Sequence, residues 1–174
     1  MTQQELMEYG MRVMNPSEKH KLLERFTGNW EVETDFVMEP GSPAMKLKSS
    51  SNAELVMGKR FVEIYTSGMV MGMPFESKQT IGHDNRKEIY TLYGIDAMGT
   101  YAVYAEGTFD EDSQTLTLYG EEDDPIFLAP RKFKFVHHFI DEDNREYELW
   151  FLTDEKGKDA PYKAVSAKVT RKKD

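Results

Sequence analysis

The sequence predicts an all-β protein, an antiparallel up-and-down β-barrel of about ten strands preceded by short N-terminal helices. From Trp30 onward, the hydrophobic period changes from about 3.6 residues to 2. The predicted strands are joined by compact turn signals such as Gly58-Lys59 and Asp84-Asn85, which are too short for helical crossovers. Because an open sheet of this size would leave exposed edges, closure into a barrel is favoured. A sandwich would need crossover loops that the sequence lacks.

The segment before the barrel is expected to be helical. Apolar residues recur at helical spacing between Leu6 and Met14. A second, short helix is expected to have Asn15 as its cap and Pro16 in its first position, and to end before Gly28. The predicted limits are a single domain over residues 1–174, a helical segment over 1–28 and a barrel over 29–172.

The strands are recognised by the alternation of apolar and polar residues. In the first strand, Trp30 and Val32 alternate with Glu31 and Glu33, which is typical of a strand with one buried face. The predicted strands cover residues 30–39, 46–57, 60–67, 75–82, 87–93, 101–108, 115–119, 131–140, 145–152 and 162–172. Each is close to its neighbour in the chain, so a meander is expected.

Composition and charge exclude several classes of function. The net charge is −9 and the pI is near 5.0, so nucleic acid and anionic membranes are not expected as partners. Cysteine is absent, which excludes disulfides, thiol catalysis and Cys-type zinc sites. No apolar stretch approaches the ~20 residues of a membrane span, and the first residues do not resemble a signal peptide. A cytoplasmic location is therefore expected.

The transition from helix to first strand carries a Gly-x-Trp motif, Gly28-Asn29-Trp30. A short helix followed by this motif resembles the calycin group, which includes lipocalins and fatty-acid-binding proteins. In lipocalins the Trp plugs the closed end of the barrel, and an Arg from the last strand packs across it. The resemblance implies that Trp30 and Arg171 form such a structural plug, held by a cation–π contact.

Further motifs in the middle of the chain extend the resemblance. They are Gly82-His83-Asp84-Asn85, Asp96-Ala97-Met98-Gly99-Thr100, Glu106-Gly107-Thr108 and Leu116-Thr117-Leu118-Tyr119-Gly120. With the spacing from His20 to Arg171, the chain resembles a bacterial calycin-like family catalogued as a domain of unknown function, DUF1579. His83 departs from the tyrosine expected in that family's turn. The resemblance implies the barrel fold but no catalytic residue.

His137 is the most informative candidate for a site inside the barrel. It alternates with Phe133, Phe135 and Phe139, so these four side chains should share the inward face of one strand. An imidazole in an apolar cup could orient a polar group of a ligand. The alternative is a core histidine hydrogen-bonded to a neighbour.

Other candidates for the cavity lining follow from alternation and composition. They are Thr34 and Phe36 in the first strand, Tyr101 and Tyr147, whose facing is open, and Met69, Met71 and Met73 at a bend near a barrel end. The histidines do not form a sequence-local trio of metal ligands, so no metal site is expected.

The leading functional hypothesis is a binding module whose interior holds a small apolar or amphipathic molecule, without a cofactor. One alternative is a haem-binding barrel of nitrobindin type, which resembles this shape and uses a histidine ligand. A second is a small enzyme with His137 as acid or base, although enzyme activity is not favoured. A third is a filled barrel that only binds partners. The expected partner is a small ligand, and formation of a homodimer is left open.

Overall fold

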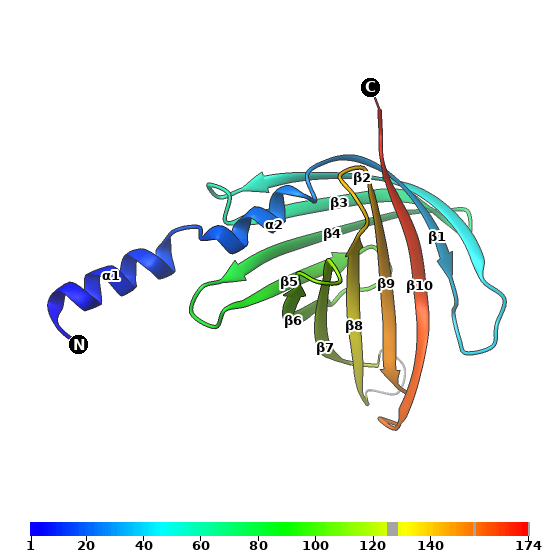
Figure 1. Ribbon diagram of the computed structural model, residues 1–174. Coiled ribbons are helices and arrows are strands. Elements are labelled where there is room, and N and C mark those ends of the chain that lie inside the picture. Colours follow the sequence, from blue (N-terminus) through cyan, green and yellow to red (C-terminus); the bar gives the residue numbers. More distant parts are fainter. Residues whose placement is uncertain (125–128, 155, 174) are drawn as a thin grey trace.

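The computed structural model describes residues 1–124, 129–154 and 156–173. Its strands form a closed antiparallel barrel in which each strand pairs with its sequence neighbours and β1 pairs with β10 (Figure 1). The strands are β1 Gly28–Phe36, β2 Met45–Val56, β3 Phe61–Val70, β4 Met73–Asp84, β5 Ile89–Asp96, β6 Ala102–Asp110, β7 Thr115–Asp123, β8 Pro130–Phe139, β9 Asn144–Thr153 and β10 Asp159–Arg171. The predicted up-and-down barrel is confirmed.

The barrel closes where the first strand meets the last. Trp30 of β1 lies opposite Arg171 of β10, and Phe36 lies opposite Val165. Since the remaining pairs join strands that follow one another in the chain, every strand has two hydrogen-bonded neighbours, and among the described residues no sheet edge is left open.

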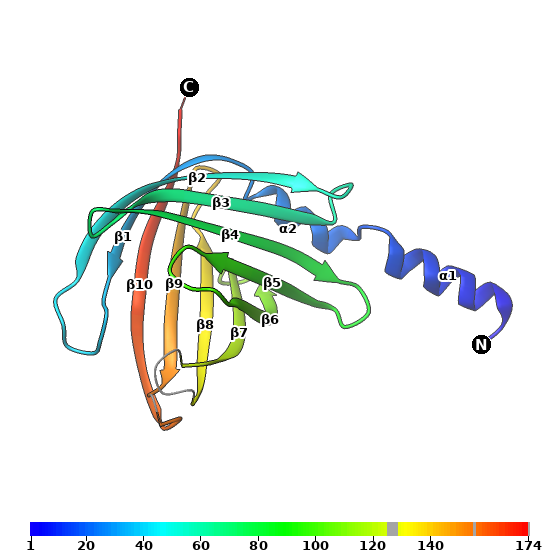
Figure 2. The same ribbon diagram turned by 180° about the vertical axis from the view of Figure 1, so that it is seen from behind.

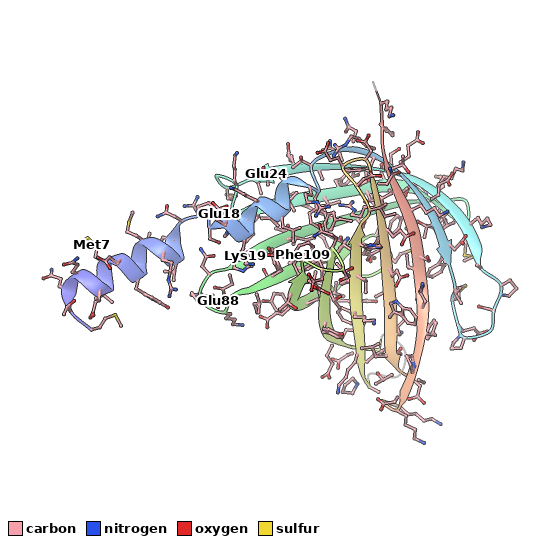
Figure 3. The ribbon with its side chains drawn as sticks, in the orientation of Figure 1. Met7, Glu18, Lys19, Glu24, Glu88 and Phe109 are labelled. Atoms are coloured by element: carbon pink, nitrogen blue, oxygen red, sulfur yellow. The ribbon has the colours of Figure 1, made fainter. Side chains whose placement is uncertain are left out.

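Helix α1, Gln3–Met14, extends away from the barrel in both views (Figures 1 and 2). Its start has a capping box, in which the Thr2 hydroxyl and the Glu5 carboxylate each accept a backbone N–H. None of its residues is buried, and Met7 lies on the part farthest from the strands (Figure 3). Its last turn is tethered by Arg60, whose guanidinium donates to the carbonyl of Met14 at 2.8 Å.

The second helical segment begins later than predicted. It consists of a 3₁₀ turn, Glu18–His20, followed by α2, Lys21–Glu24. Asn15 is the C-cap of α1 rather than an N-cap. Ser17 takes the N-cap position, because its backbone N–H donates to Nδ1 of His20 at 3.0 Å and its carbonyl accepts from the N–H of His20.

Helix α2 covers one end of the barrel and packs its apolar side chains into it. Leu23 of α2 is fully buried, as is Phe26, which follows the helix. Arg25, the C-cap of α2, donates to Gln114 in the β6–β7 turn at 2.6 Å. We call this end, with α2 and the turns at 57–60, 85–88, 111–114 and 140–143, the closed end. The opposite end, with the turns at 71–72 and 97–101, is the open end. The hydrophobic core is formed chiefly by side chains from α2, from Phe26 and from β3 to β8.

Candidate functional site

The interior of the barrel contains a cavity of about 350 Å³. This volume lies in the range of small-molecule sites, roughly 300–1,000 Å³. Its walls are largely apolar, with Val32, Ile64 and Leu149 among the lining residues. At the open end the lining includes the exposed side chains of Met98 and Tyr101, so the cavity meets solvent there.

Most of the residues predicted for the cavity contribute to its lining. They are Thr34, Phe36, Met69, Tyr101, Phe135, His137 and Tyr147. Tyr147 is directed inward and its ring stacks on that of Phe135, with 6.0 Å between the centroids. The Tyr147 hydroxyl hydrogen-bonds with Gln79, and burial raises its pKa. Tyr101 and Met69 lie at the open end and are about half exposed.

The other predicted lining residues are corrected by the structure. Phe133 and Phe139 do not line the cavity, because core side chains fill the space around them; Phe139 packs against Phe26, with 5.0 Å between ring centroids. Met71 and Met73 are 67% and 59% exposed. Met71 has a positive φ of 52° in the two-residue turn between β3 and β4, so the alternation that directs Met69 to the opening breaks there.

His137 lies deep in the cavity and is only 2% exposed. Its ring centroid is 5.2 Å from that of Phe26 and 4.9 Å from that of Tyr147. Neither ring nitrogen has a hydrogen-bond partner among the described residues. Burial, together with the charge of Arg145, holds the pKa of His137 well below its usual value, so the imidazole is neutral.

Arg145, which the sequence analysis did not identify, lines the same cavity. It is 5% exposed, and its guanidinium carbon lies 4.6 Å from the ring centroid of Phe26 and 5.2 Å from that of Trp30. The signal was present in the sequence. Arg145 alternates with Tyr147, Leu149 and Phe151, so the same period-2 argument that selected Tyr147 places Arg145 on the inward face.

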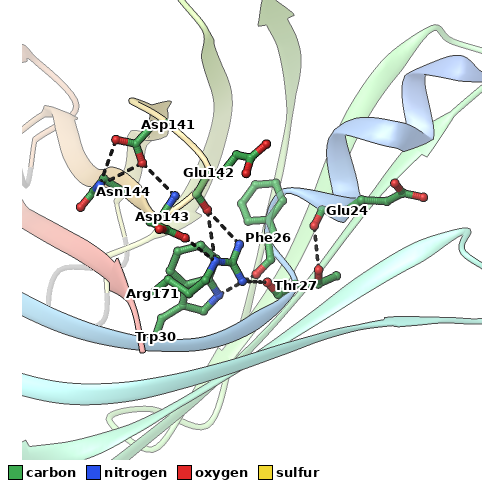
Figure 4. A network of polar contacts seen from close by, with 9 residues as sticks. All are labelled: Glu24, Phe26, Thr27, Trp30, Asp141, Glu142, Asp143, Asn144 and Arg171. Atoms are coloured by element: carbon green, nitrogen blue, oxygen red, sulfur yellow. Dashed lines mark hydrogen bonds and ion pairs between the residues drawn. The ribbon is translucent and has the colours of Figure 1, made fainter. Parts of the chain in front are cut away.

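Trp30 of β1 and Arg171 of β10 lie opposite each other where the barrel closes (Figure 4). Trp30 is 1% exposed and its indole Nε1 donates to the carbonyl of Phe26 at 2.8 Å. The guanidinium carbon of Arg171 lies 4.2 Å from the Trp30 ring centroid. Arg171 also donates to the carbonyl of Thr27 at 2.9 Å and pairs with the Asp143 carboxylate at 3.1 Å. These contacts fix strand β10 to the segment that joins α2 to β1 and to the turn between β8 and β9.

Acidic side chains line the cavity near its open end, whereas Arg145, deeper in the barrel, is basic. Asp96 and Glu122 line the cavity there, and Glu122 pairs with Arg131 at 2.6 Å. The described residues contain no group of three or more His, Cys, Asp or Glu side chains arranged to hold a metal ion. Within the same residues, no helix is long and apolar enough to cross a membrane.

The fold and the internal cavity define a calycin-like β-barrel with space for a small molecule. The chain belongs to the family described as "Protein of unknown function (DUF1579)", whose model matches residues 15–171. No curated protein matches the sequence.

Two solved structures share this architecture. The S-type phycobiliprotein lyase CPES from Guillardia theta aligns with a TM-score of 0.64 and 13% identity, over 91% of this chain and 94% of that chain. The protein Rv2717c from M. tuberculosis aligns with a TM-score of 0.62 and 14% identity, over 91% of this chain and 100% of that chain. At these identities the likeness concerns the fold.

Proposed function

We propose that this protein binds a small apolar or amphipathic molecule inside the barrel. The observation that carries the proposal is the cavity of about 350 Å³, which has largely apolar walls and meets solvent at the open end. A barrel whose interior is filled by its own side chains would have no such space. The apolar walls would contribute roughly 25 cal/mol for each Å² of ligand surface that they remove from water.

A cavity-filling variant tests the proposal. Ala167 is buried on β10 and lines the cavity, whereas its neighbour Ser166 is exposed on the outer face. We expect the neutral apolar dye Nile red to bind with one-to-one stoichiometry, and Ala167→Phe to weaken this binding at least about tenfold, a loss of about 1.4 kcal/mol. The matched control, Ser166→Phe, should bind like the unmodified protein. Absence of saturable binding, or equal binding by the two variants, would refute the proposal.

Haem binding is a second candidate, favoured by one observation. His137 lies in the cavity as a neutral imidazole whose two nitrogens have no partner among the described residues, which is the state required of an axial ligand. Titration with haemin would then produce a Soret band that disappears in His137→Phe and persists in His138→Phe, since His138 lies on the outer face of the same strand. Equal spectra for both variants would exclude this role.

Location and the remaining partners rest on composition and charge alone. A cytoplasmic location and the absence of a nucleic-acid or membrane partner follow from the net charge of −9 and the lack of cysteine, and they stay predictions.

A further inference from the structure

The cavity contains a buried positive charge with no counter-ion among the described residues. Arg145 forms no ion pair with a carboxylate there, and its Nε and Nη1 atoms have no hydrogen-bond partner. Burial, and to a lesser extent the charge of Arg171, lower its pKa to about 9, so the guanidinium is still charged at neutral pH. A buried charge of this kind is costly unless it is paired.

Two other partly buried arginines of the barrel have carboxylate partners. Arg131 pairs with Glu122 at 2.6 Å and with Asp124 at 3.2 Å, and Arg171 pairs with Asp143 at 3.1 Å. Each has therefore exchanged water for a carboxylate. The guanidinium of Arg145 lies over the aromatic rings of Phe26, Trp30 and Phe139. Cation–π contacts hold the guanidinium in place, but they leave its N–H groups without acceptors.

A second unpartnered group lies beside this charge. His137 also lines the cavity, both of its ring nitrogens lack a hydrogen-bond partner among the described residues, and the charge of Arg145 contributes to lowering its pKa. Its neutral ring has one N–H donor. Two deeply buried donor groups thus share one cavity. Both lie toward the closed end, because His137 is near the end of β8 and Arg145 is near the start of β9. The carboxylates that line the cavity, those of Asp96 and Glu122, belong to the open end.

We propose that the ligand carries a carboxylate, and that Arg145 binds this group at the closed end with His137 donating a second hydrogen bond. The apolar remainder of the ligand would then extend along the cavity toward Leu149 and Phe151. This inference rests on the proposed function, since it assigns the charge and the orientation of the molecule that the barrel holds. The guanidinium supplies parallel N–H donors that match a carboxylate, and the low-dielectric surroundings strengthen the pairing.

The test compares two probes with the same tail, decanoate and 1-decanol, by titration calorimetry of the full chain at neutral pH. We expect decanoate to bind about 10- to 100-fold more tightly than decanol, which is the range for a hydrogen bond to a charged group. In Arg145→Met, an unbranched apolar side chain still packs on Phe26 while the charge is removed. Decanoate should lose its advantage in this variant, and decanol should bind as before.

Arg25→Met is the matched control. Arg25 also lies over the Phe139 ring, at 4.4 Å, but it is not among the residues that line the cavity. Its replacement removes one positive charge and one cation–π contact and should leave the preference for decanoate unchanged. A similar loss of preference in Arg25→Met and Arg145→Met would show that net charge, and not the Arg145 site, selects the probe, and would overturn the inference.

The outcomes separate this inference from the proposed function. Equal binding of decanoate and decanol by the unmodified protein would overturn the inference and leave the binding function standing. Failure of both probes, together with failure of Nile red, would remove the binding function itself. If Arg145→Met does not fold, Arg145→Lys keeps a positive charge and should keep a preference for decanoate. Loss of this preference in Arg145→Lys would equally overturn the inference.

Discussion

Replacement of Trp30 tests the structure at the point where α2, β1 and β10 meet. The side chain is 1% exposed, and removal of a buried aromatic side chain costs about 3–5 kcal/mol. Trp30→Ala also leaves the carbonyl of Phe26 without its 2.8 Å donor, and it removes the ring that faces the guanidinium of Arg171 at 4.2 Å. A cation–π contact contributes about 0.5–2 kcal/mol. We therefore expect a loss at the upper end of the range, about 5 kcal/mol.

A loss of this size would leave many domains unfolded, since their total stability is about 5–15 kcal/mol. Trp30→Phe provides a milder variant that keeps a ring but removes the N–H group, and we expect it to cost about 1–3 kcal/mol. Trp150→Ala is the control, because Trp150 is only partly buried on β9 and its indole donates to Glu148. Its replacement should cost about 1 kcal/mol.

Urea unfolding followed by far-UV circular dichroism measures all three variants, with the slope of the transition checked for constancy. The tryptophan emission of Trp150→Phe reports on Trp30 alone, since the chain has two tryptophans. It should be blue-shifted, as for an apolar environment. A loss below about 1 kcal/mol for Trp30→Ala, or emission typical of an exposed indole, would refute the role of Trp30 as a buried closure of the barrel.

Two further predictions concern backbone packing and pH. A Cβ atom at Gly107 would lie 1.8 Å from the carbonyl oxygen of Thr117. Gly107→Ala should therefore lower the free energy of unfolding, measured by urea denaturation, by at least about 2 kcal/mol. An unchanged free energy of unfolding would contradict the β6–β7 register. Because burial depresses the pKa of His137 from 6.5, the unfolded chain binds a proton that the folded chain does not. The free energy of unfolding should then decline as pH falls below about 6.5, by up to about 1.4 kcal/mol per pH unit. In denaturation curves measured at several pH values, His137→Phe should show a smaller dependence of this free energy on pH. An unchanged dependence would argue against a buried neutral ring.

Local patterns in the sequence were sufficient to predict the barrel. Side chains alternate across a strand and hairpins need short turns, so the period of 2 and the turn signals between Trp30 and Arg171 predicted strands that the structure confirms in order and direction. The helices before the barrel were less well determined. Asn15 and Ser17 are both good capping residues, so the sequence did not decide between them. In the structure Asn15 ends α1, and Asn85, distant in the sequence, hydrogen-bonds with both the Asn15 carbonyl and the Ser17 hydroxyl.

Alternation also identified which face of β8 points inward, but it left the facing of Tyr147 on β9 open and did not distinguish core from cavity. Phe133 and Phe135 have the same facing, yet only Phe135 borders the cavity, because the difference depends on side chains that approach from strands distant in the sequence. The absence of a carboxylate partner for Arg145 among the described residues is likewise a property of the assembled barrel. Sequence alone thus determined the strands, their order and the inward face of β8. Only the tertiary structure decided where the interior stays open and which buried charge lacks a partner, because both depend on the sum of contacts across the barrel rather than on the spacing of residues along one strand.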